Sequence, residues 1–205
     1  MRKLVVFTSV TLDGVMQAPG RPDEDTRDGF AHGGWAVPYG DEVMARVAAE
    51  GMAEAGPLLM GRRTYEDFYG FWPRQAANPF TEALDKAEKH VASTTLRGPL
   101  PWRNSRLLEG DAAEAVAALK RRPGRDLTVL GSGELVQSLR RRDLVDRYVL
   151  QVHPLVLGSG RRLFPDGGPS EALRLVDSVT TTTGVVIATY ETAGRTVDPS
   201  KEARA

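Results

Sequence analysis

The sequence contains no cysteine among its 205 residues. This absence excludes disulfide bonds, thiolate catalysis, zinc ribbons and iron–sulfur clusters together. It fits a reducing compartment, although extracellular proteins can also lack cysteine. We therefore expect a cytoplasmic protein.

The chain also lacks a charge excess and a long apolar segment. Its 27 lysine and arginine residues balance 27 aspartate and glutamate residues, which argues against a protein that coats nucleic acid or an anionic membrane. The longest apolar runs, such as residues 4–7 and 155–157, are far shorter than the roughly 20 residues that span a bilayer. The first run breaks at Thr8 and Ser9 without a cleavage site, so it predicts a strand and not a signal peptide.

The composition does provide enough apolar material for a folded core, because 41% of the residues are hydrophobic. Dividing the length by roughly 150 residues per domain gives about 1.4. We expect one domain over residues 1–192, followed by a polar tail at residues 193–205.

Short β-branched runs bounded by turn residues predict eight strands, at residues 3–10, 57–60, 90–93, 105–108, 127–130, 147–156, 173–181 and 185–191. Helical patterns occupy residues 41–55, 81–89, 111–121 and 133–141. Strands that alternate with helices of this length predict an α/β fold with a mainly parallel sheet. The last two strands are joined through Gly184 and predict an antiparallel hairpin at its edge.

Three loops carry groups that suit an anion, and each follows a predicted parallel strand. The first has a glycine, two arginines and a threonine that open a helix. The second ends in three hydroxyls with an arginine nearby, and the third is a glycine-rich turn into a helix. Open α/β sheets bind ligands at this edge, so the three loops together favour a dinucleotide. Each loop alone also fits an ordinary turn or helix cap. The residues are Gly61, Arg62, Arg63, Thr64, Ser93, Thr94, Gly131, Ser132, Gly133, Glu134 and Leu135.

Carboxylates and aromatic rings supply candidates for the substrate side. Asp13 lies in an Asp-Gly turn after the first strand, and Asp41 and Glu42 begin the first predicted helix. Trp35 and Tyr39 precede that helix and could close over a flat ring. The alternative interpretation is that the acids are turn and helix-cap residues. The three histidines show no metal-ligand spacing, and we expect no metal site.

Two sets of motifs resemble known reductases. The segment Gly61-Arg62-Arg63-Thr64-Tyr65-Glu66 resembles the Gly-Arg-x-Thr-aromatic-Glu segment of dihydrofolate reductases. The segments at residues 11–14, 143–146 and 154–160 are more similar to the reductase domain of the riboflavin-biosynthesis deaminase-reductase (RibD) and its stand-alone relatives. The resemblance covers roughly residues 3 to 192.

This resemblance implies a dihydrofolate-reductase-like fold, with three layers in the order α/β/α, and NADPH as the cofactor. It places the first loop around the phosphates, Ser93 and Thr94 at the 2′-phosphate, and the glycine turn at the pyrophosphate and nicotinamide. It further implies that Ser9 and Met16 line the nicotinamide and that Asp13 is a substrate-side acid. The spacing of Trp35, Pro38 and Asp41 resembles the segment that carries the proton-assisting acid of dihydrofolate reductases.

We therefore expect an NADPH-dependent reductase that transfers hydride to a small heterocycle, as 5-amino-6-(5-phosphoribosylamino)uracil reductase or dihydrofolate reductase does. The zinc deaminase half of the riboflavin protein needs cysteine ligands, so deamination is excluded. The alternatives are a reductase of broad or different small-molecule specificity and a ligand-binding module without turnover. Relatives imply a homodimer, formed through the late strands.

Overall fold

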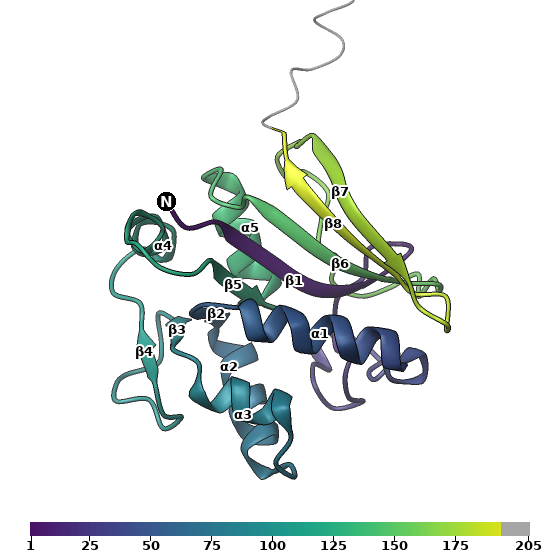
Figure 1. Ribbon diagram of the computed structural model, residues 1–205, viewed down its shortest axis with the longest axis horizontal. Helices are drawn as coiled ribbons and strands as arrows, with labels where there is room; N and C mark the ends of the chain where they lie inside the picture. The colour runs from purple at the N-terminus through teal and green to yellow at the C-terminus, as the bar shows by residue number, and fades with distance from the viewer. Residues whose placement is uncertain (194–205) are drawn as a thin grey trace, which may run out of the picture.

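Eight strands form a single mixed sheet in the computed structural model, which describes residues 1–193 (Figure 1). The tail predicted beyond residue 193 lies outside the described residues. The order across the sheet is β4-β3-β2-β5-β1-β6-β8-β7. Neighbours from β4 to β6 are parallel, whereas β8 is antiparallel to both β6 and β7, which confirms the predicted fold class. The strands are β1 (Leu4–Thr11), β2 (Leu58–Gly61), β3 (Lys89–Ala92), β4 (Ser105–Leu107), β5 (Leu127–Leu130), β6 (Arg147–His153), β7 (Leu173–Thr180) and β8 (Val186–Thr192).

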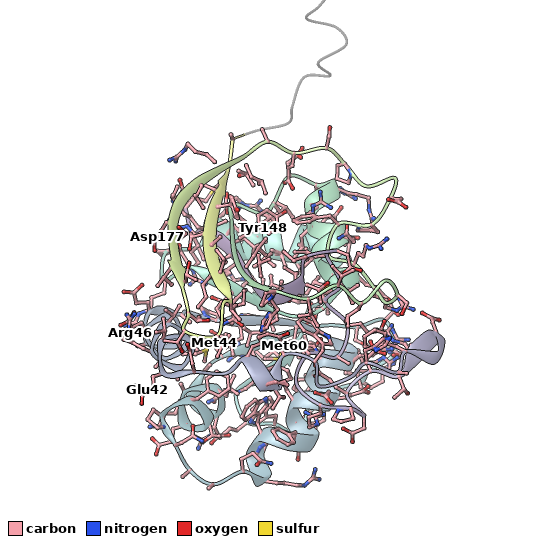
Figure 2. All side chains as sticks on the ribbon, turned by 90° about the vertical axis from the view of Figure 1, so that its right-hand side faces the viewer. Glu42, Met44, Arg46, Met60, Tyr148 and Asp177 are labelled. Atoms are coloured by element: carbon pink, nitrogen blue, oxygen red, sulfur yellow. The ribbon has the colours of Figure 1, made fainter. Side chains whose placement is uncertain are left out.

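Helices cover both faces of the sheet. In Figure 1, α1 lies in front of the strands and α5 behind them. One core cluster joins α4 and α5 to the Leu4 and Val6 face of β1, and a second joins α2 and α3 to β2 and β3. Figure 2 shows Met60 and Tyr148 enclosed in the body of the protein. The helices are α1 (Glu42–Glu54), α2 (Arg62–Phe71), α3 (Pro79–Lys86), α4 (Ala112–Arg121) and α5 (Gly133–Arg141), with short 3-10 turns at Arg27–Gly29, Val37–Tyr39 and Trp72–Arg74.

Two predicted boundaries shift for local reasons. The strand expected at 147–156 ends at His153, because Pro154 has no amide hydrogen for the ladder and the Leu155 amide turns back to the His153 carbonyl. The helix expected at 81–89 begins earlier, at Pro79. Asn78 caps it in a capping box with Thr81, which places proline at the first helical position, where its missing N–H costs nothing.

Helix α1 leaves part of the sheet face open. Asp41 caps its N-terminus as the sequence predicts, but none of its residues is fully buried. Its apolar residues Val47 and Met52 are only half-buried. A cavity of about 1960 Å³ runs from this space to the carboxyl ends of the parallel strands. The incomplete cover therefore leaves room for a ligand between α1 and the sheet.

Candidate active site

The carboxyl ends of β2, β3 and β5 open into the same cavity, which we call the cleft. These strands are neighbours and parallel, so the loops that follow them meet at one edge of the sheet. The cleft is lined by residues 61–64, 93–95 and 130–135. The structure thus brings together all three loops that the sequence predicts to bind an anion.

Ser132 joins the first loop to the third. Its hydroxyl accepts a hydrogen bond from the Gly61 amide at 2.7 Å and donates to the Thr64 hydroxyl at 2.8 Å. Ser132 adopts left-handed backbone angles, φ 63° and ψ 59°, a conformation that non-glycine residues rarely take. We infer that Ser132 organises the cleft: the Gly61 amide, which could have faced an anion, is engaged by the neighbouring loop.

The glycines of these loops permit close packing of the backbone. A Cβ at Gly133 would lie 3.0 Å from the Met16 sulfur, and one at Gly61 would lie 3.3 Å from the Ser132 hydroxyl oxygen. Gly131 has a φ of 56°, which favours glycine. Met16 therefore packs directly on the glycine turn, and its place beside the nicotinamide stays a prediction. Leu135 on α5 also lines the cleft, but its side chain is buried in the core cluster that α5 forms with the sheet.

Three guanidinium groups surround one carboxylate at the start of α5. Nη1 atoms of Arg27, Arg63 and Arg161 lie 3.4, 3.4 and 3.5 Å from Oε1 of Glu134. These distances exceed the roughly 2.7–2.9 Å of a strong charge-assisted hydrogen bond, and the Glu134 side chain is 74% exposed. The three cations come from separate segments and line the cleft. Arg27 also pairs with Asp25, and Arg161 pairs with Asp28 at 2.9 Å. The three guanidinium groups therefore form a loose cluster, largely balanced by carboxylates, at a helix N-terminus, where anions are favoured.

The sequence analysis found only Arg63 of this cluster. Arg27 lies in the loop between β1 and α1, and Arg161 lies between β6 and β7. Neither position follows a strand end with the glycine or hydroxyl pattern of the three loops. Arg62, the other predicted cation, pairs with Glu66 one helical turn on at 2.9 Å and also lines the cleft.

The hydroxyls after β3 divide into two roles. The Ser93 hydroxyl accepts hydrogen bonds from the amides of Thr95 and Leu96, at 3.1 and 2.9 Å, and so ends the strand in a turn. Thr94 and Thr95 line the cleft beside it. Ser93 shapes the loop, and the Thr94 position faces the cavity.

Asp13 holds two loops together by hydrogen bonds and does not face the cleft. Its carboxylate accepts hydrogen bonds from the Thr11 hydroxyl at 2.5 Å and from the amides of Leu157 and Gly158 at 3.2 and 2.9 Å. The Thr11 hydroxyl, followed by these amides, lowers the pKa of Asp13. Because Asp13 is not among the residues that line the cleft, the structure favours a loop-tethering role over the predicted acid.

Asp41 is similarly occupied. One carboxylate oxygen caps α1 by accepting from the Met44 amide at 2.8 Å, and the other accepts from the amide and hydroxyl of Thr182 at 2.6 and 2.7 Å. These bonds, that from Met44 first, lower the pKa of Asp41. Glu42 is exposed, and Figure 2 shows it at the outer surface of the molecule. Both acids sit at the rim of a smaller recess and outside the cleft.

The predicted role of Trp35 as an exposed lid over a flat ring is wrong. Trp35 is 7% exposed and packs with Val15, Ala18 and Phe30, and its indole N–H donates to the Gln17 carbonyl at 2.7 Å. Its ring also meets the edge of the buried His153 at 5.0 Å. Burying so large an aromatic ring is more favourable than leaving it exposed to water in the loop.

Tyr39 likewise packs inward. Its ring contacts His153 edge-on at 5.6 Å, and its carbonyl accepts from the Thr183 hydroxyl. Neither Tyr39 nor Trp35 lines the cleft. The predicted aromatic substrate contacts therefore belong to the packing of the loop between β1 and α1.

Polar side chains on the open face of the sheet form a pair that the sequence analysis missed. Ser9 on β1 and Gln151 on β6 are register partners, and the Ser9 hydroxyl donates to Oε1 of Gln151 at 2.9 Å. Ser9 lines the cleft, and its contact with a nicotinamide stays a prediction. Gln151 lay within a predicted strand, and only the pairing of β6 with β1 places it next to Ser9.

Residues 1–193 contain neither a membrane-spanning helix nor a cluster of metal ligands. No helix in this part of the chain combines the length and hydropathy of a membrane span. Nor do three or more acidic or histidine side chains of these residues group in a way that could hold a metal ion.

Comparison with known proteins gives relatives of the same length. The uncharacterized protein YyaP of Bacillus subtilis is 27% identical over 202 residues, which cover 94% of this chain and 96% of YyaP. The uncharacterized protein YwjB of the same organism is 26% identical over 182 residues, covering 85% and 89% of the two chains.

Two solved structures share the fold. A putative riboflavin biosynthesis protein from Shewanella sp. PV-4 has a TM-score of 0.65 and 21% identity, with 93% of this chain and 98% of that chain covered. A pyrimidine reductase-like protein from Corynebacterium diphtheriae has a TM-score of 0.64 and 14% identity, with 93% and 92% covered. Residues 2–187 match the family described as the RibD C-terminal domain. The chain thus belongs to the RibD C-terminal domain family, a family of reductase domains.

Proposed function

We propose that the protein is an NADPH-dependent reductase that transfers hydride to a small heterocyclic substrate with a polarised C=N or C=O bond. The observation that carries the proposal is the cleft, where three parallel strand ends present glycines, hydroxyls and guanidinium groups side by side. Membership of a reductase family supports the reaction class. The names of the solved relatives, which mention riboflavin biosynthesis and a pyrimidine reductase, support a pyrimidine-like substrate.

The residues of the cleft fit a cofactor with three phosphates. At the start of α2, Arg62 and Arg63 would reach the 2′-phosphate together with Thr94, and Thr64 would hold phosphate oxygens. The glycine turn would lie against the pyrophosphate, since Gly131 and Gly133 leave no side chain in the way. When bound, NADPH supplies the hydride.

We further propose that water provides the proton that balances the hydride. Asp13 and Asp41 each accept three hydrogen bonds from protein groups, and the pKa of each is lowered. A carboxyl group with a lowered pKa is ionised near neutral pH and is a poor proton donor. The hydride would add to the carbon of the polarised bond, and water would protonate its nitrogen or oxygen.

Titration with reduced nicotinamide cofactors tests the proposal. Arg62→Ala and Arg63→Ala each remove a charged contact worth about 1.5–3 kcal/mol, so we expect NADPH binding to weaken by roughly 10- to 100-fold. NADH lacks the 2′-phosphate and should lose much less. Cofactor fluorescence measures both affinities.

Arg46→Ala is the matched control, because Arg46 also pairs with a glutamate one turn away, Glu50, but lies on the outer side of α1. It should leave both affinities unchanged. Equal loss of NADPH and NADH in the two cleft variants would contradict the 2′-phosphate assignment. No binding of either cofactor to the wild-type protein would contradict the proposed function itself.

A further inference from the structure

Beside the cleft lies a smaller recess that none of the residues assigned to the cofactor phosphates lines. We define the α1 recess as the cavity of about 740 Å³ between α1 and the sheet. Phe7, Ala48, Trp72 and Phe80 give it mostly apolar walls, and Phe7, Ala48 and Phe80 also line the cleft. The two spaces therefore share walls and form adjoining compartments.

Gln151 is the one side chain that brings a buried polar group into the α1 recess among the described residues. The residue is 6% exposed and lines the recess. Its Oε1 is engaged by the Ser9 hydroxyl. Its Nε2 has no hydrogen-bond partner among residues 1–193, in contrast to the structural Gln17, whose Nε2 donates to two carbonyls. The residue is buried as a whole, but its Nε2 atom is reached by solvent in the recess, so this donor is available to a ligand or to water.

The Ser9–Gln151 hydrogen bond crosses the boundary between the compartments. Ser9 lines the cleft and Gln151 lines the recess, and their strands are adjacent. A flat ring that reaches the cleft from the recess would have one edge at the Gln151 amide. The aromatic side chains of Phe7, Trp72 and Phe80 would contact its faces or borders, as apolar walls with few polar groups do in ligand sites.

Building on the proposed function, we propose that Gln151 determines substrate specificity by donating from Nε2 to a carbonyl oxygen of the substrate ring. Ser9 is a positioning residue, because its hydroxyl holds Oε1 and so turns Nε2 toward the recess. A site that hydrogen-bonds a polar atom discriminates strongly against a ring that lacks it. The pair thus selects rings with a carbonyl at that edge.

Calorimetric titration with two rings tests this role. Lumazine (pteridine-2,4-dione) carries carbonyl groups, whereas quinoxaline has two flat rings and no carbonyl. Each is titrated into the protein with and without saturating NADP⁺. For wild type we expect lumazine to bind, and Gln151→Leu should weaken it by about tenfold, the value of one hydrogen bond. Quinoxaline affinity should be unchanged or slightly higher in that variant, because no amide is left to desolvate.

Further variants separate recognition from a structural effect. Ser9→Ala should weaken lumazine by a few fold, and Ser9→Thr, which keeps the hydroxyl, should restore it. Gln75→Leu makes the same chemical change at an exposed position and should leave both rings unaffected. A structural defect in Gln151→Leu would lower both ring affinities together and would overturn the proposal.

The remaining outcomes are also decisive. Unchanged lumazine affinity in Gln151→Leu would overturn the proposal, and so would a wild-type protein that binds NADP⁺ but not lumazine. Lumazine binding that depends on Gln151 in a protein that fails to bind NADP⁺ would support Gln151 and contradict the cofactor assignment. The two proposals therefore fail separately.

Discussion

Replacing Ser132 by alanine tests whether one hydroxyl organises the cleft. The change removes the two short hydrogen bonds of the hydroxyl, from the Gly61 amide at 2.7 Å and to the Thr64 hydroxyl at 2.8 Å, together with a longer contact to the Leu130 carbonyl at 3.4 Å. Each of the two short bonds is worth about 0.5–1.5 kcal/mol net, so we expect the free energy of unfolding to fall by about 1–3 kcal/mol. Because these bonds hold the loop after β2 against the glycine turn, NADPH affinity should also fall when the two loops lose their fixed spacing.

Glycine at the same position separates the hydrogen bonds from the backbone conformation. Ser132→Gly loses the same two bonds but removes a left-handed non-glycine residue, φ 63°, which costs roughly 1–2 kcal/mol. The expected order of stability is therefore wild type, then Ser132→Gly, then Ser132→Ala. Ser138→Ala is the control, because the Ser138 side chain makes no hydrogen bond within residues 1–193, and alanine is the better helix former.

Urea unfolding followed by tryptophan fluorescence measures the three stabilities, and cofactor fluorescence measures the affinity. The reasoning would be refuted if Ser132→Ala were as stable as wild type, or if Ser132→Gly were the least stable of the three. A stability loss with unchanged NADPH affinity would limit Ser132 to a folding role.

Three further predictions concern other charged and aromatic groups. Glu134→Gln removes the carboxylate that faces three guanidinium groups. NADPH should then bind about two- to fivefold more tightly, which is the scale of an exposed ion pair. The Kd for NADPH at low and high salt measures this change, and weaker binding would contradict the prediction. Asp41→Ala should lower the stability of the protein at pH 7. The difference in stability between wild type and variant should shrink as the pH falls below 3.8 toward the lowered pKa of Asp41, because the carboxylate stabilises the fold only while it is ionised. Thermal unfolding of both proteins from pH 2 to 7 checks the sign of this change. Trp35→Phe should lower the free energy of unfolding by about 1–2 kcal/mol, because the hydrogen bond to the Gln17 carbonyl is lost, and it should not change NADPH affinity. An unfolding curve identical to that of wild type would contradict the buried role of Trp35. The expected homodimer stays a prediction, which light scattering of the purified protein can test.

Local patterns in the sequence predicted most of the fold. Strand and helix signals depend on neighbours a few residues apart, so the strand at 127–130, the hairpin at Gly184 and the Asp41 helix cap were all correct. The three anion loops were also found, because glycine, hydroxyl and guanidinium groups that follow a strand form a local pattern. Parallel pairing then brings such loops to one edge.

The same local reasoning failed where a side chain had two roles. Trp35 and Tyr39 in a polar loop fit a lid as well as a small core, and Asp13 in an Asp-Gly turn fits an acid as well as a tether. Local sequence does not distinguish these, because the deciding partners are distant: His153 for the two rings, and the amides of Leu157 and Gly158 for the carboxylate.

The order of strands and helices and the three loops of the cleft could be predicted from residue types over short spans, because those features depend on near neighbours in the chain. Which groups share the cleft depends on how the elements pack together. Arg27 and Arg161 reach Glu134, and Gln151 reaches Ser9, across separations of 107, 27 and 142 residues. Such contacts arise from the packing of strands and loops, so local sequence patterns do not predict them.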